Sequence, residues 1–344
     1  MTLSLAQLEQ VRLILRGGSV VDWYRLRFDS LDDVRGFLAL QGGDLDDPAD
    51  LARLEHLRGE AARYLTDEHG YKVPPELLSC DAVDLFLFAS ERRGRRRDRF
   101  FACLLLKVMH IVHHIEAREL AYRLPLSQAA LFDLLVDKVD VFAARLQADG
   151  FPLVRYTGGQ KSTTSLLTKL LVKKEHHAAA IHDRVRFRFV VRRTFDLVEL
   201  LARMTRELFP FNYVAPAQTV NHLVNFTAFV ESQPAYRAWA ADLQLELGEE
   251  DQALRPLNEF SGPSYAVINF VVDVPLRIPD AALSASDASL GRVVFALAEF
   301  QIVDEVTDDQ NEVGENRHDR YRARQLGIVR ERLERGKRGA RDDA

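Results

Sequence analysis

The sequence predicts an α+β protein, with a helical N-terminal region followed by a mixed β-sheet flanked by helices. Up to residue 150, apolar residues recur at helical spacing between capping residues and glycine or proline breaks. Beyond residue 150, runs of β-branched and aromatic residues lie between helical segments. We therefore expect a helical region over 1–150, an α/β domain over 151–335 and a charged, disordered tail over 336–344.

Composition excludes several classes of protein. The chain has 344 residues and a formal net charge of −5, so it has no global basic field that would hold nucleic acid. Its two cysteines, Cys80 and Cys103, lack the spacing of a disulfide scaffold or a zinc ribbon. Arg12 and Arg16 interrupt the apolar N-terminus, and no segment reaches the roughly 20 apolar residues of a membrane helix. We expect a cytoplasmic protein without a membrane partner.

The helical region can be divided by its capping signals. Asp29 and Ser30 precede one amphipathic segment, Asp47 and Pro48 precede a second, and Ser127 precedes the last. Pro125 ends the most apolar segment, and Gly150 ends the region. The main expected helices are 3–15, 31–40, 48–65, 100–124 and 127–148.

An arginine-rich segment, ERRGRRRDRF, covers residues 91–100. Six arginines against two acids could contact the phosphates of a nucleic acid. A solvated helix start is the more common meaning of such a run.

Three histidines and a glutamate cluster further along the same helical region, at His110, His113, His114 and Glu116. His110 and His114 are four residues apart and share a helix face, a spacing that can bind zinc. The H-E-x-x-H order is absent, and no third ligand is evident from the sequence. Histidines buried in a core or an interface are the favoured interpretation.

A candidate anion site follows the break at Phe151-Pro152. The stretch GGQKSTTSLLTK places hydroxyls and lysines at the start of an amphipathic helix, where exposed N–H groups attract anions. Lys161, Ser165 and Lys169 are spaced by four and would share one face. The Walker A pattern is not met, and a capped helix with solvated lysines is the alternative.

The sheet is predicted from three further runs. Residues 185–192 alternate apolar residues with arginines, which places Arg188 on the polar face of a strand opened by Asp183. A helix over 195–208, a short strand near Tyr213 and a polar excursion over 217–256 follow. The last two expected strands are the run YAVINFVVDVPLRI and the run 293–302, which carries Glu299 near its end.

Two carboxylates at strand ends indicate a metal and phosphate site. If the strands of Asp183 and Glu299 are neighbours, the pair can hold Mg²⁺, which prefers one or two carboxylates together with phosphate oxygens. The lysines at 161 and 169 would neutralise the same phosphates. A polar loop and a basic helix that includes His318 follow the strand of Glu299. Such an arrangement suits phosphoryl or nucleotidyl transfer. The alternative is a surface edge strand with a charged helix behind it.

From Gln160 onwards, about the last half of the chain resembles the synthetase domain of the RelA/SpoT-type alarmone synthetases. The family motif Lys-x-x-x-Ser-Ile-x-x-Lys corresponds to Lys161, Ser165, Leu166 and Lys169, and Asp-x-x-x-x-Arg to Asp183 and Arg188. Its Glu-Val-Gln-Ile strand resembles residues 299–302, including Gln301. One register without gaps then aligns its last helical motif with Glu312, Gly314, His318, Tyr321 and Arg322.

The resemblance implies transfer of pyrophosphate from ATP to a nucleotide. It assigns Mg²⁺ to Asp183 and Glu299, with Glu299 also as a general base, and the phosphates of ATP to Lys161 and Lys169. Tyr265 occupies the position of a tyrosine that stacks on the acceptor base. Ser165, Arg188, Gln301 and His318 are the other expected nucleotide-binding residues.

The chain departs from the family pattern at the acceptor side. The motif Tyr-x-Ser-Leu-His reads Tyr265-Ala266-Val267-Ile268-Asn269, and Gly159 replaces the arginine before the first lysine. The acceptor could therefore be GDP or GTP, or the 3′ end of a tRNA as in toxin members of the superfamily. A catalytically degenerate module that senses nucleotides or binds a partner is the second hypothesis, and a structural interaction protein is the third. An oligomer is compatible with all three.

Overall fold

The computed structural model describes most of the chain. The described residues are 2–17, 23, 28–90, 95–172, 185–216, 218–239, 243, 265–284, 286–313 and 318–334. The expected tail over 336–344 and Asp183 lie outside these ranges.

The helical region forms as its capping signals predict. The hydroxyls of Ser4, Ser30 and Ser127 and the carboxylate of Asp47 accept backbone N–H groups at four helix starts. The helices are α1 (Leu5–Arg16), α2 (Leu31–Leu40), α3 (Pro48–Asp67), α4 (Pro75–Ser79), α5 (Asp84–Ala89), α6 (Arg96–Arg123) and α7 (Gln128–Ala148).

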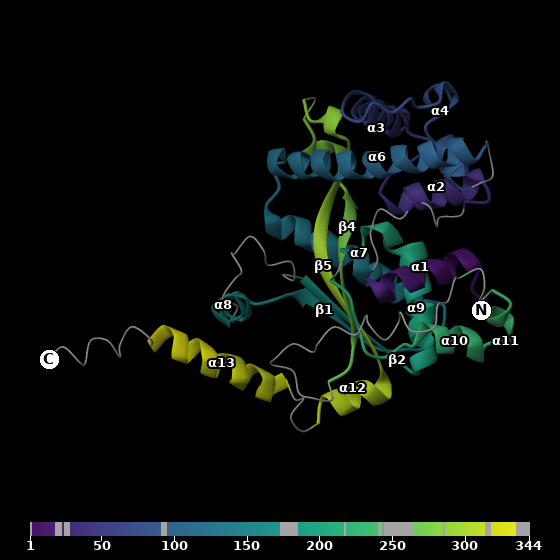
Figure 1. Cartoon of the computed structure of the whole chain (residues 1–344). Coiled ribbons are helices and arrows are strands. Elements are labelled where there is room, and N and C mark those ends of the chain that lie inside the picture. Colours follow the sequence, from purple (N-terminus) through teal and green to yellow (C-terminus); the bar gives the residue numbers. More distant parts are fainter. Residues whose placement is uncertain are drawn as a thin grey trace.

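Helix α6 crosses the ends of strands β4 (Ile268–Arg277) and β5 (Val293–Asp304), as Figure 1 shows. It also packs on α3 and α5. By length and composition alone α6 could span a membrane, with a mean hydropathy of 1.4 in its most apolar window. In the folded chain, 44% of that window is buried inside the protein. Burial against α3, α5 and the sheet therefore accounts for much of the apolar surface of α6.

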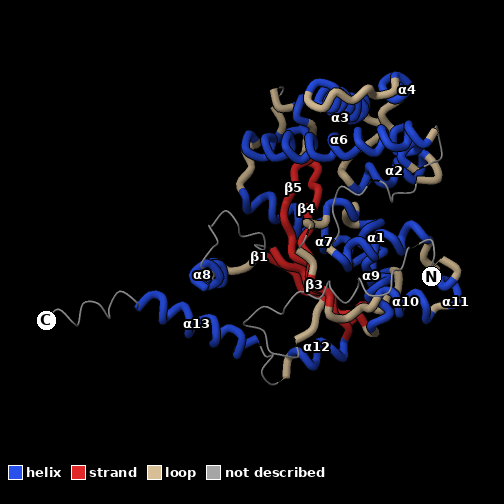
Figure 2. The backbone as a smooth tube through the Cα atoms, viewed as in Figure 1, coloured by secondary structure: helices blue, strands red, loops and turns tan. Residues whose placement is uncertain are grey.

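The sheet contains five described strands in the order β1-β2-β5-β4-β3. The edge and central strands not yet named are β1 (Leu153–Gln160), β2 (Val185–Val191) and β3 (Val220–Asn221). Only the central pair β2–β5 is parallel; the other three pairs are antiparallel. Figure 2 shows the strands running between the helices. The predicted α+β class, with a mixed sheet flanked by helices, is confirmed.

Alternation along the central strands separates an apolar face from a polar one. Phe187, Phe300 and Phe270 stack across β2, β5 and β4, with ring centroids 5.4 and 5.6 Å apart. Phe142 of α7 and Phe209, which follows α9 (Thr194–Glu207), pack onto this apolar face. The residues that alternate with these phenylalanines along each strand, including Glu299, therefore point to the opposite face.

The apolar face leaves no room for a side chain at Gly158 on β1. A Cβ at this position would lie 2.4 Å from Cδ1 of Phe187, closer than real contacts allow. The glycines of β1 also explain why the sequence did not predict this strand, because glycine is rare in strand interiors.

Two other predictions over the second half were wrong. The segment near Tyr213 forms a 3₁₀ turn (Phe211–Tyr213), and only Val214 bridges to the sheet, at Val272. The polar stretch after the last strand, expected as a loop, begins with helix α12 (Glu305–Asn311), because the Asp304 side chain accepts the N–H of Thr307 and caps it. The other described helices are α8 (Thr163–Val172), α10 (Phe226–Ser232), α11 (Pro234–Arg237) and α13 (His318–Glu334).

Candidate functional site

The candidate site lies on the polar face of the sheet, around Glu299. Glu299 is paired with Arg186 of β2 on one side and Val271 of β4 on the other. The expectation that it lies near a strand end was wrong, because five more residues of β5 follow it and Asp304 still pairs with Val191. The carboxylate is thus held in the middle of the sheet by rigid strands.

Each carboxylate oxygen of Glu299 accepts two hydrogen bonds. Lys161 Nζ and Arg186 Nε each lie 2.9 Å from Oε2. Asn269 Nδ2 and Gln301 Nε2 lie 3.1 and 3.2 Å from Oε1. The four donors come from the β1–α8 turn, β2, β4 and β5, so one buried carboxylate joins four segments of the chain.

Charge compensation explains why this carboxylate can be buried. Glu299 is only 5% exposed, and burial by itself would raise its pKa. The positive charges and hydrogen bonds of Arg186 and Lys161 outweigh burial and hold the pKa of Glu299 well below its ordinary value. Glu299 is therefore ionised at neutral pH and, in this arrangement, a weak base.

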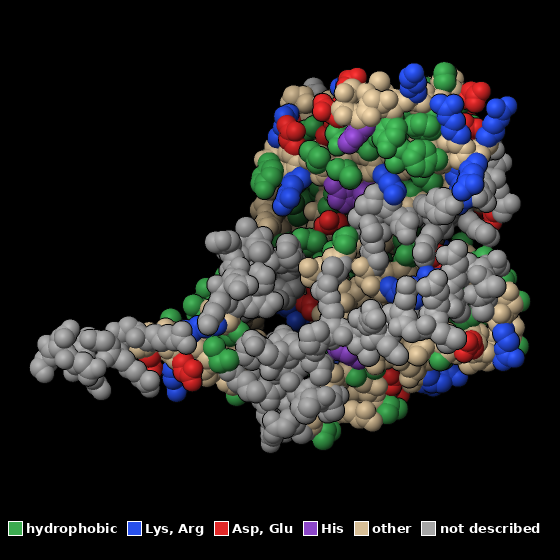
Figure 3. Space-filling model, viewed as in Figure 1, with side chains coloured by type: hydrophobic (Ala, Val, Ile, Leu, Met, Phe, Trp, Pro, Cys, Tyr) green, Lys and Arg blue, Asp and Glu red, His purple; other side chains and the backbone are tan. Residues whose placement is uncertain are grey.

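A second charged cluster adjoins the first. Arg188 Nε and Nη2 lie 3.1 and 2.6 Å from Asp308 Oδ1, and Arg155 pairs with the other oxygen of this carboxylate. Arg188 Nη1 donates to Gln301 Oε1 at 3.0 Å and reaches the Tyr265 hydroxyl at 3.3 Å. Gln301 thus connects the two clusters. In the view of Figure 3, acidic and basic side chains lie together at a hollow in this part of the surface.

Helix α12 has a fixed position relative to Tyr265. Asn311 at its end accepts the N–H of Ala266 at 3.0 Å and donates to the carbonyl of the same residue at 2.7 Å. This bidentate contact ties α12 to the segment that enters β4. The same helix places Asp308, 2% exposed, beside Arg188.

The expected anion helix is arranged differently from the prediction. Lys161 precedes α8, so it does not share a helix face with Ser165; its side chain crosses to Glu299 instead. The Ser165 side chain is exposed and 2.9 Å from the Ser162 hydroxyl, which accepts the N–H of Ser165. Spacing by four was misleading because the chain is not helical at residue 161.

The structure brings together five of the nine sequence-predicted site residues. Lys161, Arg188, Tyr265, Gln301 and Glu299 form the two linked clusters. Ser165 lies in the turn of α8 that follows Lys161. Lys169 and His318 are placed only as backbone positions in α8 and α13, and Asp183 lies outside the described residues.

Sequence reasoning missed Arg186, Asn269 and Asp308. The alternation of β2 could have identified Arg186, because it shares the polar face of Arg188. Asn269 was noticed only as a departure from the family pattern, although it pairs with Gln301 across β4 and β5. Asp308 lies on a helix that was expected to be a loop; the capping residue Asp304 could have indicated that helix, but not the contact of Asp308 with Arg188.

The described residues do not by themselves form a Mg²⁺ site. Each oxygen of Glu299 already accepts two hydrogen bonds, and two of the four donors are cationic. The carboxylate therefore has no oxygen position open to a metal ion. Within the described ranges, no three His, Cys, Asp or Glu side chains converge as a metal site. The predicted partner carboxylate, Asp183, is outside those ranges.

The histidine cluster packs between α6 and the sheet. His114 stacks on Phe295 of β5, with centroids 4.2 Å apart and an interplanar angle of 9°. His110 Nδ1 lies 3.2 Å from the amide of Asn212, and burial lowers the pKa of His110 to about 3. Glu116 pairs with Arg53 and His56 of α3. These contacts agree with the interpretation as core and interface histidines.

The described arginines of segment 91–100 make local contacts. The N–H of Arg95 donates to Asp98 at 2.7 Å at the start of α6. Arg99 donates to the carbonyl of Ala89 at 3.1 Å, and Arg97 lies 5.6 Å from the ring centroid of Phe101. A contact with RNA at this segment stays a prediction.

Similarity to known proteins is found among solved structures only. No protein-family model matches the chain, and no curated protein matches it. Among solved structures, it is similar to small alarmone synthetase 2 from Bacillus subtilis, at 14% identity, 62% of this chain, 96% of the other and a TM-score of 0.30. It is also similar to small alarmone synthetase 1 from the same organism, bound to its product pppGpp. Here the sequence identity is 14%, the match covers 68% of this chain and 97% of the other, and the TM-score is 0.30.

A GTP pyrophosphokinase family protein from Streptococcus pneumoniae is also similar, at 13% identity, 63% of this chain, 95% of the other and a TM-score of 0.29. These proteins are of the type that the sequence motifs resemble. Similarity at this identity and TM-score does not extend to activity.

Proposed function

We propose that the chain transfers pyrophosphate, or a nucleotidyl group, from ATP to the hydroxyl of a nucleotide or of an RNA 3′ end. The observation that carries this proposal is the linked pair of charged clusters on the polar face of the sheet. Among its described residues, four cations (Lys161, Arg155, Arg186 and Arg188) accompany two carboxylates (Glu299 and Asp308), a local balance of +2 in a chain of net charge −5.

A local excess of positive charge fits a polyphosphate substrate. Arginine binds phosphate oxygens with paired N–H groups, and lysine acts as a point charge. In pyrophosphate transfer, the acceptor oxygen forms a bond to the β-phosphorus of ATP, the bond from that phosphorus to the α–β bridging oxygen breaks, and AMP leaves. Lys161 and Arg186 would stabilise the charge on the transferred group, and Tyr265 would lie against the acceptor base.

Mg²⁺ belongs to this proposal as a cofactor carried by ATP. Glu299 could bind Mg²⁺, or accept the proton of the acceptor hydroxyl, only after one of its four hydrogen-bond donors has moved away. Lys161 is the donor best placed to do so, because its side chain comes from a turn while the other three come from strands. Asp183 would supply the second carboxylate.

The same hydrogen bonds favour a second candidate function. A carboxylate whose four partners are satisfied, and whose pKa is held low, is suited to fixing a structure rather than to taking a proton. A degenerate module that binds nucleotides without turnover would retain such a cluster. Asn269 and Val267 at the altered acceptor motif are compatible with this candidate.

Two preparations of ATP, each labelled at one phosphate, separate the possibilities. The full chain is incubated with Mg²⁺, ATP labelled at the α- or γ-phosphate, and GDP, GTP or tRNA. Pyrophosphate transfer moves the γ label to the acceptor and leaves labelled AMP, whereas nucleotidyl transfer moves the α label. If folded protein transfers neither label to any acceptor, the enzyme proposal is refuted. Thermal stabilisation by ATP without turnover would favour the binding module.

The Lys161→Met variant tests the site assignment. We expect it to lose at least tenfold in transfer or, for the binding module, in ATP affinity, because it removes a charge that contacts the central carboxylate. Lys72→Met, at an exposed lysine outside the site, is the matched control. Equal activity and affinity in both variants would show that ATP binds elsewhere.

A further inference from the structure

A cavity of about 80 Å³ lies between the helical region and the start of β5, away from the Glu299 site. Helices α2, α3, α5 and α6 contribute its walls, together with the segment that leads into Val293. Since one water needs roughly 10–15 Å³ of such space, the cavity has room for about five to eight water-sized groups. That space matches a molecule with a single ring.

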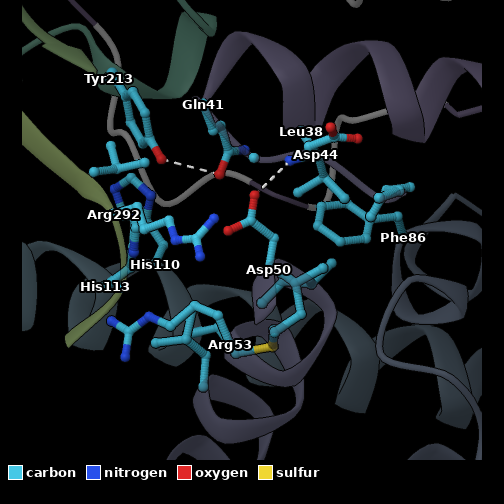
Figure 4. A pocket seen from close by; sticks show the side chains of 18 of the residues that line it. Leu38, Gln41, Asp44, Asp50, Arg53, Phe86, His110, His113, Tyr213 and Arg292 are labelled. Carbon is cyan, nitrogen blue, oxygen red and sulfur yellow. Dashed lines mark hydrogen bonds between the residues drawn. The ribbon is translucent and has the colours of Figure 1, made fainter. Parts of the chain in front are cut away.

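The two sides of the cavity differ in character. Figure 4 shows His110, His113, Arg53 and Arg292 along one side, and Leu38 and Phe86 along the other. The apolar side can cover the face of a ring, while the polar side can meet its substituents.

Arg53 presents two buried donors that have no partner. Its side chain is 10% exposed; Nη1 donates to the Ser289 carbonyl at 3.1 Å and forms an ion pair with Glu116 at 2.5 Å. Within the described part of the chain, Nε and Nη2 make no hydrogen bond. These atoms form the edge of the guanidinium that can bind one acceptor group with two N–H groups. Leaving such donors unsatisfied is unfavourable, so they indicate a missing acceptor.

The space beside that edge depends on a glycine. A Cβ on Gly291 would lie 3.0 Å from Arg53 Nε, and residue 291 has a φ of +90°, which favours glycine. His113 Nδ1 is a further buried atom without a partner on the same side. The polar side therefore has both room and unused hydrogen-bonding groups.

Three of the charged side chains that line the cavity, Asp50, Arg53 and Arg292, are already compensated. Arg53 pairs with Glu116, Asp50 with Arg277 at 2.5 Å, and Arg292 with Asp47 at 2.6 Å. An anionic ligand would bring a charge into this partly buried space without an available counter-charge, and a cationic ligand would be repelled by Arg53. A neutral ligand with an acceptor would satisfy Arg53 without that cost.

We propose that this cavity binds an uncharged, single-ring heterocycle whose carbonyl oxygen accepts hydrogen bonds from Nε and Nη2 of Arg53. The ring would lie against Leu38 and Phe86. The ligand would contact α2, α3, α5, α6 and the start of β5 together, and β5 is the strand that carries Glu299. Binding is independent of whether the Glu299 site is catalytic.

In the test, the full chain is titrated separately with 2-pyridone, benzene and benzoate, and binding is measured by ligand-observed NMR. We expect 2-pyridone to bind with a Kd of about 1 mM or tighter. Benzene lacks the acceptor and benzoate carries a charge, so each should bind at least tenfold more weakly. Benzene binding equally well would show a dry apolar hole, tighter binding of benzoate would show an anion site, and no binding of 2-pyridone would refute the site. Each of these results overturns the proposal.

Two variants with matched controls locate the site. Arg53→Lys keeps the positive charge beside Glu116 but lacks the two-donor edge, and should weaken 2-pyridone about tenfold; Arg58→Lys on the same helix, outside the cavity, should not. Leu54→Phe fills the cavity and should abolish binding, whereas Leu131→Phe on α7 should not. Unchanged affinity in Arg53→Lys overturns the proposal even if Leu54→Phe fails to fold.

Discussion

The replacement Glu299→Gln gives the sharpest test of how the charged site is held together. A glutamine keeps the size of the side chain but converts one carboxylate oxygen into an NH₂ group. Each oxygen of Glu299 accepts from two donors, so neither orientation of the amide avoids placing N–H groups against N–H groups. The side chain has no room to turn outward, because it is only 7% exposed.

The expected cost follows from the contacts that are lost. Hydrogen bonds to charged groups contribute about 1.5–3 kcal/mol each, and removing one member of a buried ion pair costs about 3–5 kcal/mol. The Arg186 side chain is 37% exposed and can partly recover its hydration, whereas that of Lys161 is 15% exposed. We therefore expect Glu299→Gln to lower the free energy of unfolding by about 2–4 kcal/mol. Loss of transfer in this variant must accordingly be measured on protein shown to be folded.

Urea unfolding at several pH values provides the assay. The folded-state pKa of Glu299 is lowered, so its contribution is fully present above the unfolded value, near 4.5, and is lost as pH falls through the folded value. The stability difference between wild type and variant should be constant from pH 8 to about 5 and shrink below that. Glu305→Gln, at an exposed position of α12, should change stability by less than about 0.5 kcal/mol. A Glu299→Gln protein as stable as this control at pH 7 would refute the reasoning.

Three further predictions concern packing, titration and the second charged cluster. Gly158→Ala should destabilise by about 1–3 kcal/mol because its Cβ collides with Phe187, whereas Gly59→Ala in α3, with open space around it, should be neutral or stabilising in urea unfolding. The pKa of His110 is lowered to about 3, so the unfolded chain binds more protons below pH 6.5; stability should fall with pH from 6.5 downward, by up to about 1.4 kcal/mol per unit for this group, and less steeply in His110→Phe. An equal slope in both proteins would contradict this. Asp308→Asn should cost about 1–3 kcal/mol because two arginines lose their carboxylate, and an unchanged urea midpoint would show that they rehydrate freely.

Local patterns in the sequence were sufficient for much of the fold. The helices of the first half follow from capping residues and apolar spacing, which act within a few residues. Alternation over 185–191 correctly placed Arg188 on the polar face, because successive side chains of a strand point to opposite sides. The strand of Glu299 was also recognised from its β-branched and aromatic residues, although its last two residues were not.

Local patterns failed where tertiary contacts decide the structure. The edge strand β1 has two glycines and a largely exposed surface, so pairing with β2, rather than its own composition, makes it a strand. Helix α12 begins at a local cap, Asp304, but its position against the sheet depends on Asn311, which is fixed by Ala266, 45 positions away in sequence. Neither constraint can be read from neighbouring residues.

The sequence by itself determined the class of fold, the carboxylate and lysine of the candidate site, and the motifs that resemble alarmone synthetases. Only the tertiary structure decided how those residues act on each other. Parallel pairing of β2 with β5 sets Arg186 beside Glu299, 113 positions apart, and the antiparallel partner β4 adds Asn269. The physical reason is that a strand's own sequence fixes which face a side chain occupies, while the register between strands fixes its neighbours. In this chain, the register places Arg186 and Asn269 beside the carboxylate expected to bind a metal, and Lys161 and Gln301 complete its four hydrogen-bond donors.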